Sequence, residues 1–267
     1  MRTNMPEYMK LAKDVSAAIK SAVLENNRDL QEMGKKAFTG AYGATTSRMD
    51  SIAEEKALEI IASSDLKLNV LTEERGMMDN GASETIVLDP IDGTTNCISG
   101  IPFYSASIAF ARGNRLSDVF FGYVENIPAN EVYSASKGAG ASIIVSGKSD
   151  PIVRKVFDPE KVTAIAYVGK HSKMPSGLGS ARYFRCMGAA SLEMCLVARG
   201  SADIYCHMSQ PGQKLRIVDI AASVLITREA GCFVLDENFN DLEMNIDLQD
   251  RKNVIAVRDK KALEVLK

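Results

Sequence analysis

The segment Asp89–Asn96 constrains the fold of this chain more than any other part of the sequence. It reads Asp-Pro-Ile-Asp-Gly-Thr-Thr-Asn and directly follows the apolar run Thr85–Leu88. The apolar run predicts a buried strand, and the proline and glycine predict a sharp bend where that strand ends. Such a strand end brings two carboxylates and free backbone N–H groups to one point. That point can hold a hard cation and an anionic group together.

Further acidic residues stand at the ends of other expected elements. Glu73 and Glu74 follow a predicted strand at residues 66–71, and Asp219 opens a predicted helix. Two carboxylates about 4 Å apart repel by roughly 4 kcal/mol at an effective dielectric near 20, so a cluster of them requires protons or cations. Ligands that are all oxygen favour Mg²⁺, Mn²⁺ or Ca²⁺ over zinc. The two histidines of the chain are not spaced as a zinc site.

The residues after Asp92 suit the binding of phosphate. Gly93 lets the backbone approach an anion closely, and a short helix that begins here would direct its unpaired N–H groups at the anion. A threonine hydroxyl at Thr94 or Thr95, next to a bound metal, can orient a water for in-line attack. Two metals would stabilise both the attacking and the leaving oxygen.

Each of these signals also has an ordinary structural explanation when it is taken singly. Asp-x-x-Asp-Gly is common in turns. Glu73 alone is typical of a solvated strand end, Asp219 alone of a charge that stabilises a helix N-terminus, and Asp50 alone of a helix cap. Only their joint presence in one order favours a metal site.

Composition narrows the class of protein. The chain has 267 residues, 46% of them hydrophobic, which allows one large domain; we expect two halves, at residues 1–140 and 141–267. A net charge of −2 without a basic stripe disfavours nucleic acid as a partner. No apolar run is long enough to span a membrane, and residues 1–7 carry no apolar signal core. Five scattered cysteines are typical of reduced thiols in a cytoplasmic protein.

Helical and strand patterns interleave along the chain, which predicts a layered fold of the α/β or α+β class. Turns at Gly113 and Pro128 indicate an antiparallel meander over residues 105–136. The other expected elements are helices at 7–33, 50–63, 189–199, 219–230 and 260–266, an irregular glycine-rich stretch at 34–48, and strands at 66–71, 86–88, 162–168, 202–206, 232–236 and 254–257.

These residues resemble those of a known family. Asp89–Asn96 looks like the signature of the inositol monophosphatase family of Mg²⁺-dependent, lithium-sensitive sugar phosphatases, and Leu215–Gly231 is similar to its second signature. Further blocks that resemble the family are Thr46–Asp50, Thr72–Glu74 and Gly188–Cys195, so the resemblance covers nearly the whole chain. It is strongest toward the archaeal-type branch, which often accepts both inositol monophosphate and fructose 1,6-bisphosphate.

The resemblance implies a layered αβαβα fold with mixed and antiparallel sheets, commonly in a homodimer. It also implies hydrolysis of a small sugar or polyol phosphate by metal-activated water, with two or three Mg²⁺ ions for which Mn²⁺ can substitute. Position by position, the first metal would take Glu73, Asp89 and the Ile91 carbonyl, and the second Asp89, Asp92 and Asp219. A weaker third metal would use Glu73 and the loop before Asp50.

The remaining roles follow in the same way from the resemblance. Thr94, hydrogen-bonded to Asp50, would position and help to activate the attacking water, with Glu73 counted among the catalytic residues through its metal. The residues expected to contact the phosphate or the sugar are Asp92, Gly93, Thr94, Thr95, Gly188, Ala189 and Ala190.

The chain departs from inositol-selective members at one place. Many of them carry a glutamate several residues before the second-signature aspartate, and the segment 207–216 contains none. It has Lys214 and Arg216 instead. Either these are solvated surface charges, or they bind a second substrate phosphate through charge-assisted hydrogen bonds.

Three alternatives stay open. Haloacid-dehalogenase-type phosphatases use Asp-x-Asp-Gly-Thr with a covalent aspartate, but the extra residue and the proline after Asp89 favour attack by water. The second hypothesis is a phosphatase of the same family that acts on a 3′-phosphoadenosine nucleotide or on NADP. Nucleotide-specific members, however, usually have Lys-Glu where Thr95-Asn96 stands. A metal-dependent binding protein without catalysis is the third.

Overall fold

The computed structural model of the chain describes residues 5–43, 45–153 and 155–266. Most of the amino-terminal segment in which we expected no signal core therefore lies outside the described residues. Within these ranges the strands form a hairpin, a large sheet of eight strands and a small sheet of five. None of the described helices combines the length and the apolar character that crossing a bilayer requires.

The large sheet is mixed. Its strands run in the order β10-β9-β8-β7-β6-β5-β3-β4, and the β3–β5 pair is parallel while its other neighbours are antiparallel. The strand bounds are β3 (Asn69–Thr72), β4 (Gly76–Met78), β5 (Thr85–Asp92), β6 (Ser105–Ala111), β7 (Val119–Asn126), β8 (Glu131–Ser136), β9 (Ala141–Val145) and β10 (Lys148–Pro151).

The small sheet has the order β12-β11-β13-β15-β14. Its strands are β11 (Thr163–Ala166), β12 (Tyr183–Arg185), β13 (Ile204–His207), β14 (Phe233–Leu235) and β15 (Val254–Val257). The hairpin consists of β1 (Lys36–Thr39) and β2 (Thr45–Ser47). The α-helices are α1 (Met5–Asn26), α2 (Leu30–Met33), α3 (Arg48–Ala62), α4 (Thr94–Ile98), α5 (Ala190–Ala198) and α6 (Ile217–Glu229).

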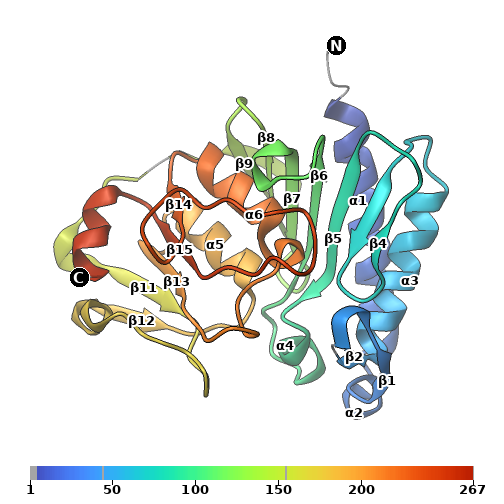
Figure 1. Cartoon of the computed structure of the whole chain (residues 1–267), viewed down its shortest axis with the longest axis horizontal. Helices are drawn as coiled ribbons and strands as arrows, with labels where there is room; N and C mark the ends of the chain where they lie inside the picture. Colours follow the sequence, from blue (N-terminus) through green and yellow to red (C-terminus); the bar gives the residue numbers. More distant parts are fainter. Residues whose placement is uncertain (1–4, 44, 154, 267) are drawn as a thin grey trace.

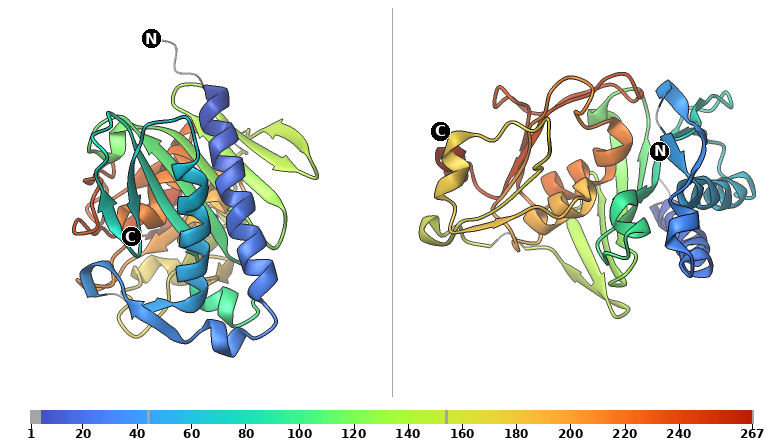
Figure 2. Two further views of the ribbon diagram at one scale, coloured as in Figure 1. Left: turned by 90° about the vertical axis from the view of Figure 1, so that its right-hand side faces the viewer. Right: turned by 90° about the horizontal axis from the view of Figure 1, so that it is seen from below.

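Five layers stack across the molecule (Figure 1). Helices α1 and α3 lie side by side on one face of the large sheet (Figure 2), and α5 and α6 lie between the two sheets. The outer face of the small sheet is covered by the 3₁₀ helices η4 (Ser176–Ser180) and η5 (Lys260–Leu266). The expected layered αβαβα fold with mixed and antiparallel sheets is confirmed.

The pattern of apolar residues explains which helix occupies which layer. Along α1 the buried positions Leu11, Val15, Ile19 and Val23 are four residues apart, so one side packs on the sheet and the other meets solvent. Helix α6 is buried on nearly all sides because the large sheet packs on one side of it and the small sheet lies on the other. A helix that is apolar all round belongs in such an inner layer.

Helix α6 approaches the large sheet very closely at Gly122 in β7. A Cβ atom at this glycine would lie 2.7 Å from the carbonyl oxygen of Ala222 in α6. Only a residue without a side chain lets the helix backbone come this near to the strand. The depth at which α6 sits therefore depends on Gly122.

The amino-terminal region differs from our predictions. The helix expected over 7–33 ends at Asn26, and a short second helix follows; the irregular stretch expected at 34–48 contains the hairpin β1–β2. Helix α3 is capped by Ser47, not by Asp50, because the Ser47 hydroxyl accepts a hydrogen bond from the Asp50 amide. Asp50 occupies the third helical position of this capping box.

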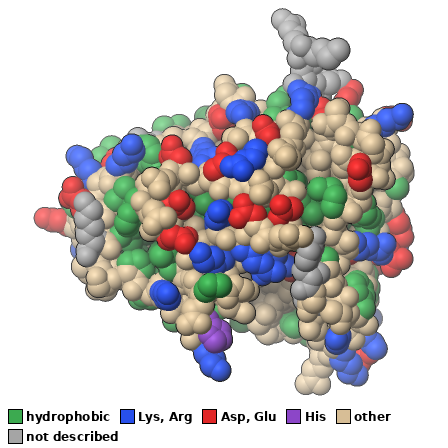
Figure 3. Space-filling view, in the orientation of Figure 1, with side chains coloured by type: hydrophobic (Ala, Val, Ile, Leu, Met, Phe, Trp, Pro, Cys, Tyr) green, Lys and Arg blue, Asp and Glu red, His purple; other side chains and the backbone are tan. Residues whose placement is uncertain are grey.

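At the other end of the chain, residues 260–266 form a 3₁₀ helix, and the edge strand β12 was not predicted. The division into halves at residues 140 and 141 stays a prediction; the large sheet itself continues to Pro151. On the face shown in Figure 3, acidic and basic side chains are interspersed.

Candidate active site

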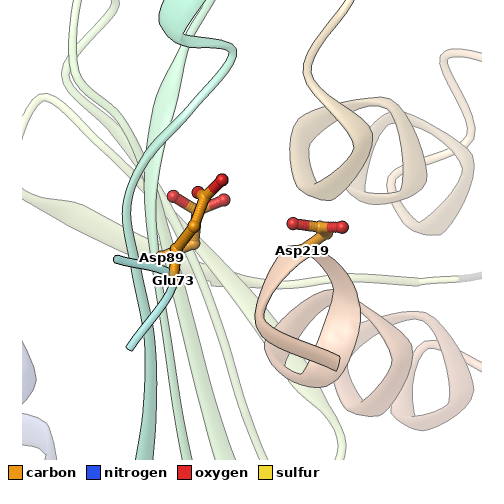
Figure 4. Close-up of side chains that lie close together, drawn as sticks. All are labelled: Glu73, Asp89 and Asp219. Atoms are coloured by element: carbon orange, nitrogen blue, oxygen red, sulfur yellow. The ribbon is translucent and has the colours of Figure 1, made fainter. Parts of the chain in front are cut away.

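Three carboxylates meet between the large sheet and α6. Oxygen atoms of Glu73, Asp89 and Asp219 all lie within 4.8 Å of one another, and they form the one such acidic group found among the described residues. Figure 4 shows Glu73 and Asp89 beside each other, across from Asp219 at the start of α6. We call these three residues the acidic cluster.

The sheet register brings the first two members together. Strands β3 and β5 are parallel neighbours, with Thr72 paired to Leu88, so Glu73 and Asp89 follow at the same edge of the sheet. Leu71 and Val87, two positions earlier, belong to the core between the sheets. Because side chains alternate along a strand, Glu73 and Asp89 also face that inner layer. Asp219 reaches them from the first turn of α6.

An extra residue in β5 places Asp92 on this same face. Asp89 pairs with Ser107 and Asp92 with Ser105, so three steps along β5 match two steps along β6. Without this β-bulge at Pro90–Ile91, residues three apart would point to opposite faces. The bulge therefore directs both aspartates to the inner layer, while Ile91 packs into the core on the other side.

Asp92 caps the start of α5 and does not belong to the acidic cluster as found. Its carboxylate accepts hydrogen bonds from the backbone of Ala190 at 3.1 Å and of Ser191 at 2.7 Å, and also from the Ser191 hydroxyl. Negative charge at a helix N-terminus is favourable. Its expected role as a ligand of a second metal stays a prediction, as does the metal role of the Ile91 carbonyl.

Thr94 and Asp50 form the expected pair. The Thr94 hydroxyl lies 2.8 Å from Asp50 Oδ1 and 3.0 Å from the Ile91 carbonyl oxygen, so either can accept its proton. Ser47 holds the other carboxylate oxygen of Asp50 by donating from its hydroxyl at 2.7 Å. Asp50 is thus fixed by the cap of α3 while it faces the β5–α4 turn.

Gly93 makes that turn possible. Its φ of 93° lies in the left-handed region, and a Cβ atom would come within 3.1–3.3 Å of Ala189, the Gly188 carbonyl and the Phe103 carbonyl. The turn and the segment Gly188–Ala190 therefore lie against each other. Thr95 lies in the first turn of α4, whose early N–H groups have no partner within a helix.

Two residues that we did not predict hold the segment Gly188–Ala190 in place. Asn96 donates from Nδ2 to the Met187 carbonyl at 2.6 Å, and Glu193 accepts from the amides of Met187 and Gly188 at 2.8 and 3.1 Å. A glutamate at the fourth position of a helix, after a glycine, was the available sequence signal. Burial raises the pKa of Glu193 to about 7.

The acidic cluster carries unfavourable charge in the absence of a metal ion. Burial, followed by repulsion from neighbouring carboxylates, raises the pKa of Asp89 well above its usual range. Burial likewise raises the pKa of Glu73 to about 7, against the opposing pull of Arg216, and that of Asp92 to about 7. A divalent cation would stabilise the ionised forms of these groups. The donors are all carboxylate oxygens, which fit Mg²⁺, Mn²⁺ or Ca²⁺.

Other charged residues near the site are engaged with partners. Arg216 bonds to Glu73 and Asp219, and Lys214 forms an ion pair with Glu237 at 2.8 Å. Glu74 is buried and accepts a hydrogen bond from Thr46, which belongs to the hairpin β1–β2. Lys214 and Arg216 therefore stay candidates for a second phosphate only if these ion pairs can exchange.

A layered fold with an all-oxygen cluster beside a glycine–threonine turn is the arrangement of a metal-dependent phosphatase. The model of the inositol monophosphatase family matches residues 4–266. An Archaeoglobus fulgidus protein named fructose-1,6-bisphosphatase/inositol-1-monophosphatase is 34% identical, with 98% of each chain covered. The chain belongs to the inositol monophosphatase family and is a phosphatase.

Two further comparisons agree with this assignment. The crystal structure of an inositol monophosphatase-fructose 1,6-bisphosphatase superposes with a TM-score of 0.85 at 30% identity, covering 97% of each chain. A Methanococcus maripaludis protein named bifunctional NADP phosphatase/NAD kinase is 29% identical over 93% of this chain and 46% of its own length. Members with different substrates are thus similar to this chain.

Proposed function

We propose that this phosphatase hydrolyses a sugar or polyol phosphate monoester with Mg²⁺, and that inositol 1-phosphate and fructose 1,6-bisphosphate are its first candidate substrates. The observation that carries the proposal is the meeting of Glu73, Asp89 and Asp219 beside the Thr94–Asp50 pair. The names of similar proteins support the substrate class.

The acidic cluster would hold the first Mg²⁺ through Glu73 and Asp89, and Asp219 would share a second with Asp89 and Asp92. We expect two ions in use, a third that binds more weakly, and Mn²⁺ as a substitute for Mg²⁺. When bound, the ions supply charge neutralisation for the phosphate and acidify the attacking water.

Thr94 and Asp50 would orient the attacking water and take part in the transfer of its proton. With its own proton donated to Asp50 Oδ1, the Thr94 hydroxyl has lone pairs free to accept a hydrogen bond from water and so to orient it. Burial raises the pKa of Asp50, which lets this carboxylate share a proton more readily than an exposed one. The hydrogen bonds from Ser47 keep Asp50 in this position.

The β5–α4 turn would bind the phosphate, and the segment Gly188–Ala190 would line the sugar. We propose backbone contacts from Gly93, Thr94 and Thr95, because a positive-φ glycine followed by a helix start presents N–H groups to an anion. Lys214 and Arg216 are proposed contacts for a second phosphate, which would distinguish fructose 1,6-bisphosphate from a monophosphate.

Hydrolysis of NADP or of a 3′-phosphoadenosine nucleotide is the second candidate. It is favoured by the similarity to the NADP phosphatase/NAD kinase from M. maripaludis. Proteins named for each of the two activities are similar to this chain, so a measured substrate preference has to separate the candidates.

A phosphate-release screen tests the proposal. Purified protein is assayed with Mg²⁺ or EDTA on inositol 1-phosphate, fructose 1,6-bisphosphate, glucose 1-phosphate, 3′-phosphoadenosine 5′-phosphate and NADP, with Asp89→Asn as the inactive control. We expect Mg²⁺-dependent release, fastest on one of the first two compounds. Preference for a nucleotide would favour the second candidate, and no release on any compound would favour a binding protein.

We also propose that the enzyme is a cytoplasmic homodimer. The five cysteines are scattered along the chain without Cys-x-x-Cys spacing, which is typical of proteins in a reducing compartment. Light scattering coupled to gel filtration should give about twice the mass of the 29.0 kDa chain.

A further inference from the structure

We propose that the Arg216 side chain is a counter-ion of the acidic cluster and that a metal ion must displace it to bind. The Arg216 side chain would thereby lower the metal affinity of the site. The inference deepens the proposed function and rests on it. It assigns to Arg216 a positioning role that is separate from contact with substrate.

The Arg216 guanidinium joins the two sides of the cluster. Its Nη2 atom lies 2.5 Å from Glu73 Oε1 and 3.1 Å from Asp219 Oδ1, so one cationic group bridges β3 and α6. The side chain is only 15% exposed. Both contacted residues are proposed metal ligands, so the guanidinium now engages oxygen atoms that a metal ion would need.

Metal and guanidinium cannot share these oxygens freely. A carboxylate that already bonds to Arg216 has one fewer lone pair for a metal ion, and a cation bound there would lie a few ångströms from a second positive charge. Such like charges repel strongly in a partly buried site. Metal binding therefore requires the Arg216 side chain to move, and the free energy of that exchange lowers the metal affinity.

The side chain is not needed for the local fold of α6. The Asp219 carboxylate accepts from the backbone amide of Arg216 at 2.7 Å, and any residue other than proline supplies that amide. Replacing the guanidinium therefore leaves this cap intact. What disappears is the positive charge between Glu73 and Asp219.

Lys214 offers a matched control. It lies two residues before Arg216, carries the same charge and is similarly buried, but it pairs with Glu237 outside the cluster. Loss of either side chain changes the net charge of the protein equally. Only the loss of Arg216 frees oxygen atoms of the acidic cluster.

The test is calorimetric titration of Mg²⁺ into metal-free wild type, Arg216→Met and Lys214→Met at pH 8. We expect Arg216→Met to bind Mg²⁺ about five to ten times more tightly than wild type, in the range of ordinary coupling between sites. Lys214→Met should stay within about twofold of wild type. Equal or weaker binding by Arg216→Met than by wild type would overturn the proposal.

A second measurement covers the case in which Arg216→Met does not fold. In wild type, the arginine side-chain resonances of Arg216, assigned with Arg216→Lys, should be protected in EDTA and should lose that protection as Mg²⁺ is added. Unchanged resonances across a titration that saturates the site would contradict displacement.

The two proposals fail in different ways. If wild type takes up no Mg²⁺ and releases no phosphate, the proposed function fails and this inference with it. If wild type binds Mg²⁺ and is active but the affinity of Arg216→Met does not rise, only the role assigned to Arg216 fails.

Discussion

Asp89 is the residue on which the site depends most. It is 2% exposed, belongs to the acidic cluster, and has a proposed role toward both metals. Its charge is unfavourable in the metal-free protein, because burial and neighbouring carboxylates both act against ionisation. Function and stability therefore make opposite demands on this side chain.

The substitution Asp89→Asn should have opposite effects on activity and on metal-free stability. We expect phosphatase activity to fall by at least about a thousandfold, since a proposed metal ligand worth several kcal/mol is lost. In EDTA at pH 8 the variant should melt about 3 °C above wild type, because a buried charge has been removed. Activity assays and thermal melts check both parts. A variant that is inactive and also less stable would indicate that Asp89 is structural.

The pH dependence of metal-free stability has a definite sign. Glu73 and Asp92 have pKa values near 7 in the folded protein, above those of unfolded carboxyls. Between about pH 4 and 7 the folded state therefore holds more protons than the unfolded state. The stability that these groups contribute is present at low pH and is lost as the pH rises through 7.

Mg²⁺ should reverse this loss. The increase in melting temperature on adding saturating Mg²⁺ should be larger at pH 8 than at pH 5.5, because metal binds the ionised carboxylates. Differential scanning fluorimetry at the two pH values measures it. Asp89→Asn serves as the control and should show a much smaller difference. An equal Mg²⁺ effect at both pH values would contradict a carboxylate site.

At the scale of elements, the β5–α4 turn joins the acidic cluster to the proposed phosphate site. Gly93→Ala would impose a left-handed conformation on an alanine, and its Cβ atom would lie only 3.1–3.3 Å from its nearest neighbours. We expect a loss of about 2 kcal/mol in stability and at least a tenfold loss in kcat. Gly138→Ala is the control, because its φ of 76° is similar but its surroundings are open.

Comparison of Gly93→Ala with Gly138→Ala isolates the effect of the β5–α4 turn on activity. Both place an alanine at positive φ, so both should lose some stability by chemical denaturation. Only Gly93→Ala should also lose activity. If both variants kept full activity, the close approach of Gly93 to Gly188–Ala190 would not matter for catalysis.

Ser47 tests a different element, the start of α3. Ser47→Ala removes the cap of the helix and the hydroxyl that donates to Asp50. We expect a cost of about 1 kcal/mol in the free energy of unfolding and a severalfold fall in kcat with little change in KM. Unchanged kcat would show that Asp50 is positioned without this hydrogen bond.

Elements with strong local patterns could be predicted from the sequence. The apolar run ending at Asp89 and the helix that begins near Asp219 were predicted because each carries its own periodicity and end signals. Their meeting was inferred only through the family resemblance. No local pattern shows that β3 and β5 are parallel neighbours.

The missed features depend on contacts between distant segments. The hairpin β1–β2 pairs segments that lack the alternation of apolar and polar residues by which a strand is predicted. Asn96 donates to the carbonyl of Met187, which is 91 positions away in the sequence. The ion pair between Arg216 and Glu73 spans 143 positions, so no local pattern indicated it.

At the scale of the whole molecule, the position of α6 links core packing to the site. Gly122→Ala would place a methyl group 2.7 Å from the Ala222 carbonyl, so the helix must move away from the sheet. We expect a loss of about 2–3 kcal/mol in stability and weaker Mg²⁺ binding, because Asp219 moves with the helix. Denaturant unfolding and calorimetry measure these effects.

A glycine in open surroundings gives the comparison for this variant. Gly179→Ala adds the same methyl group in η4, where nothing lies within 4 Å. It should leave both stability and Mg²⁺ affinity near the wild-type values. If Gly122→Ala had the same stability and the same Mg²⁺ affinity as Gly179→Ala, the layers would be able to adjust without disturbing the acidic cluster.

The acidic cluster takes its members from positions 73, 89 and 219, that is, from two neighbouring strands and from a helix that enters much later in the chain. During synthesis, the first two side chains emerge well before the third. A nascent chain can therefore offer only part of a chelate until its final quarter has left the ribosome and packed. Tight uptake of the ion would thus mark the completion of folding, and magnesium would select finished molecules over partial ones.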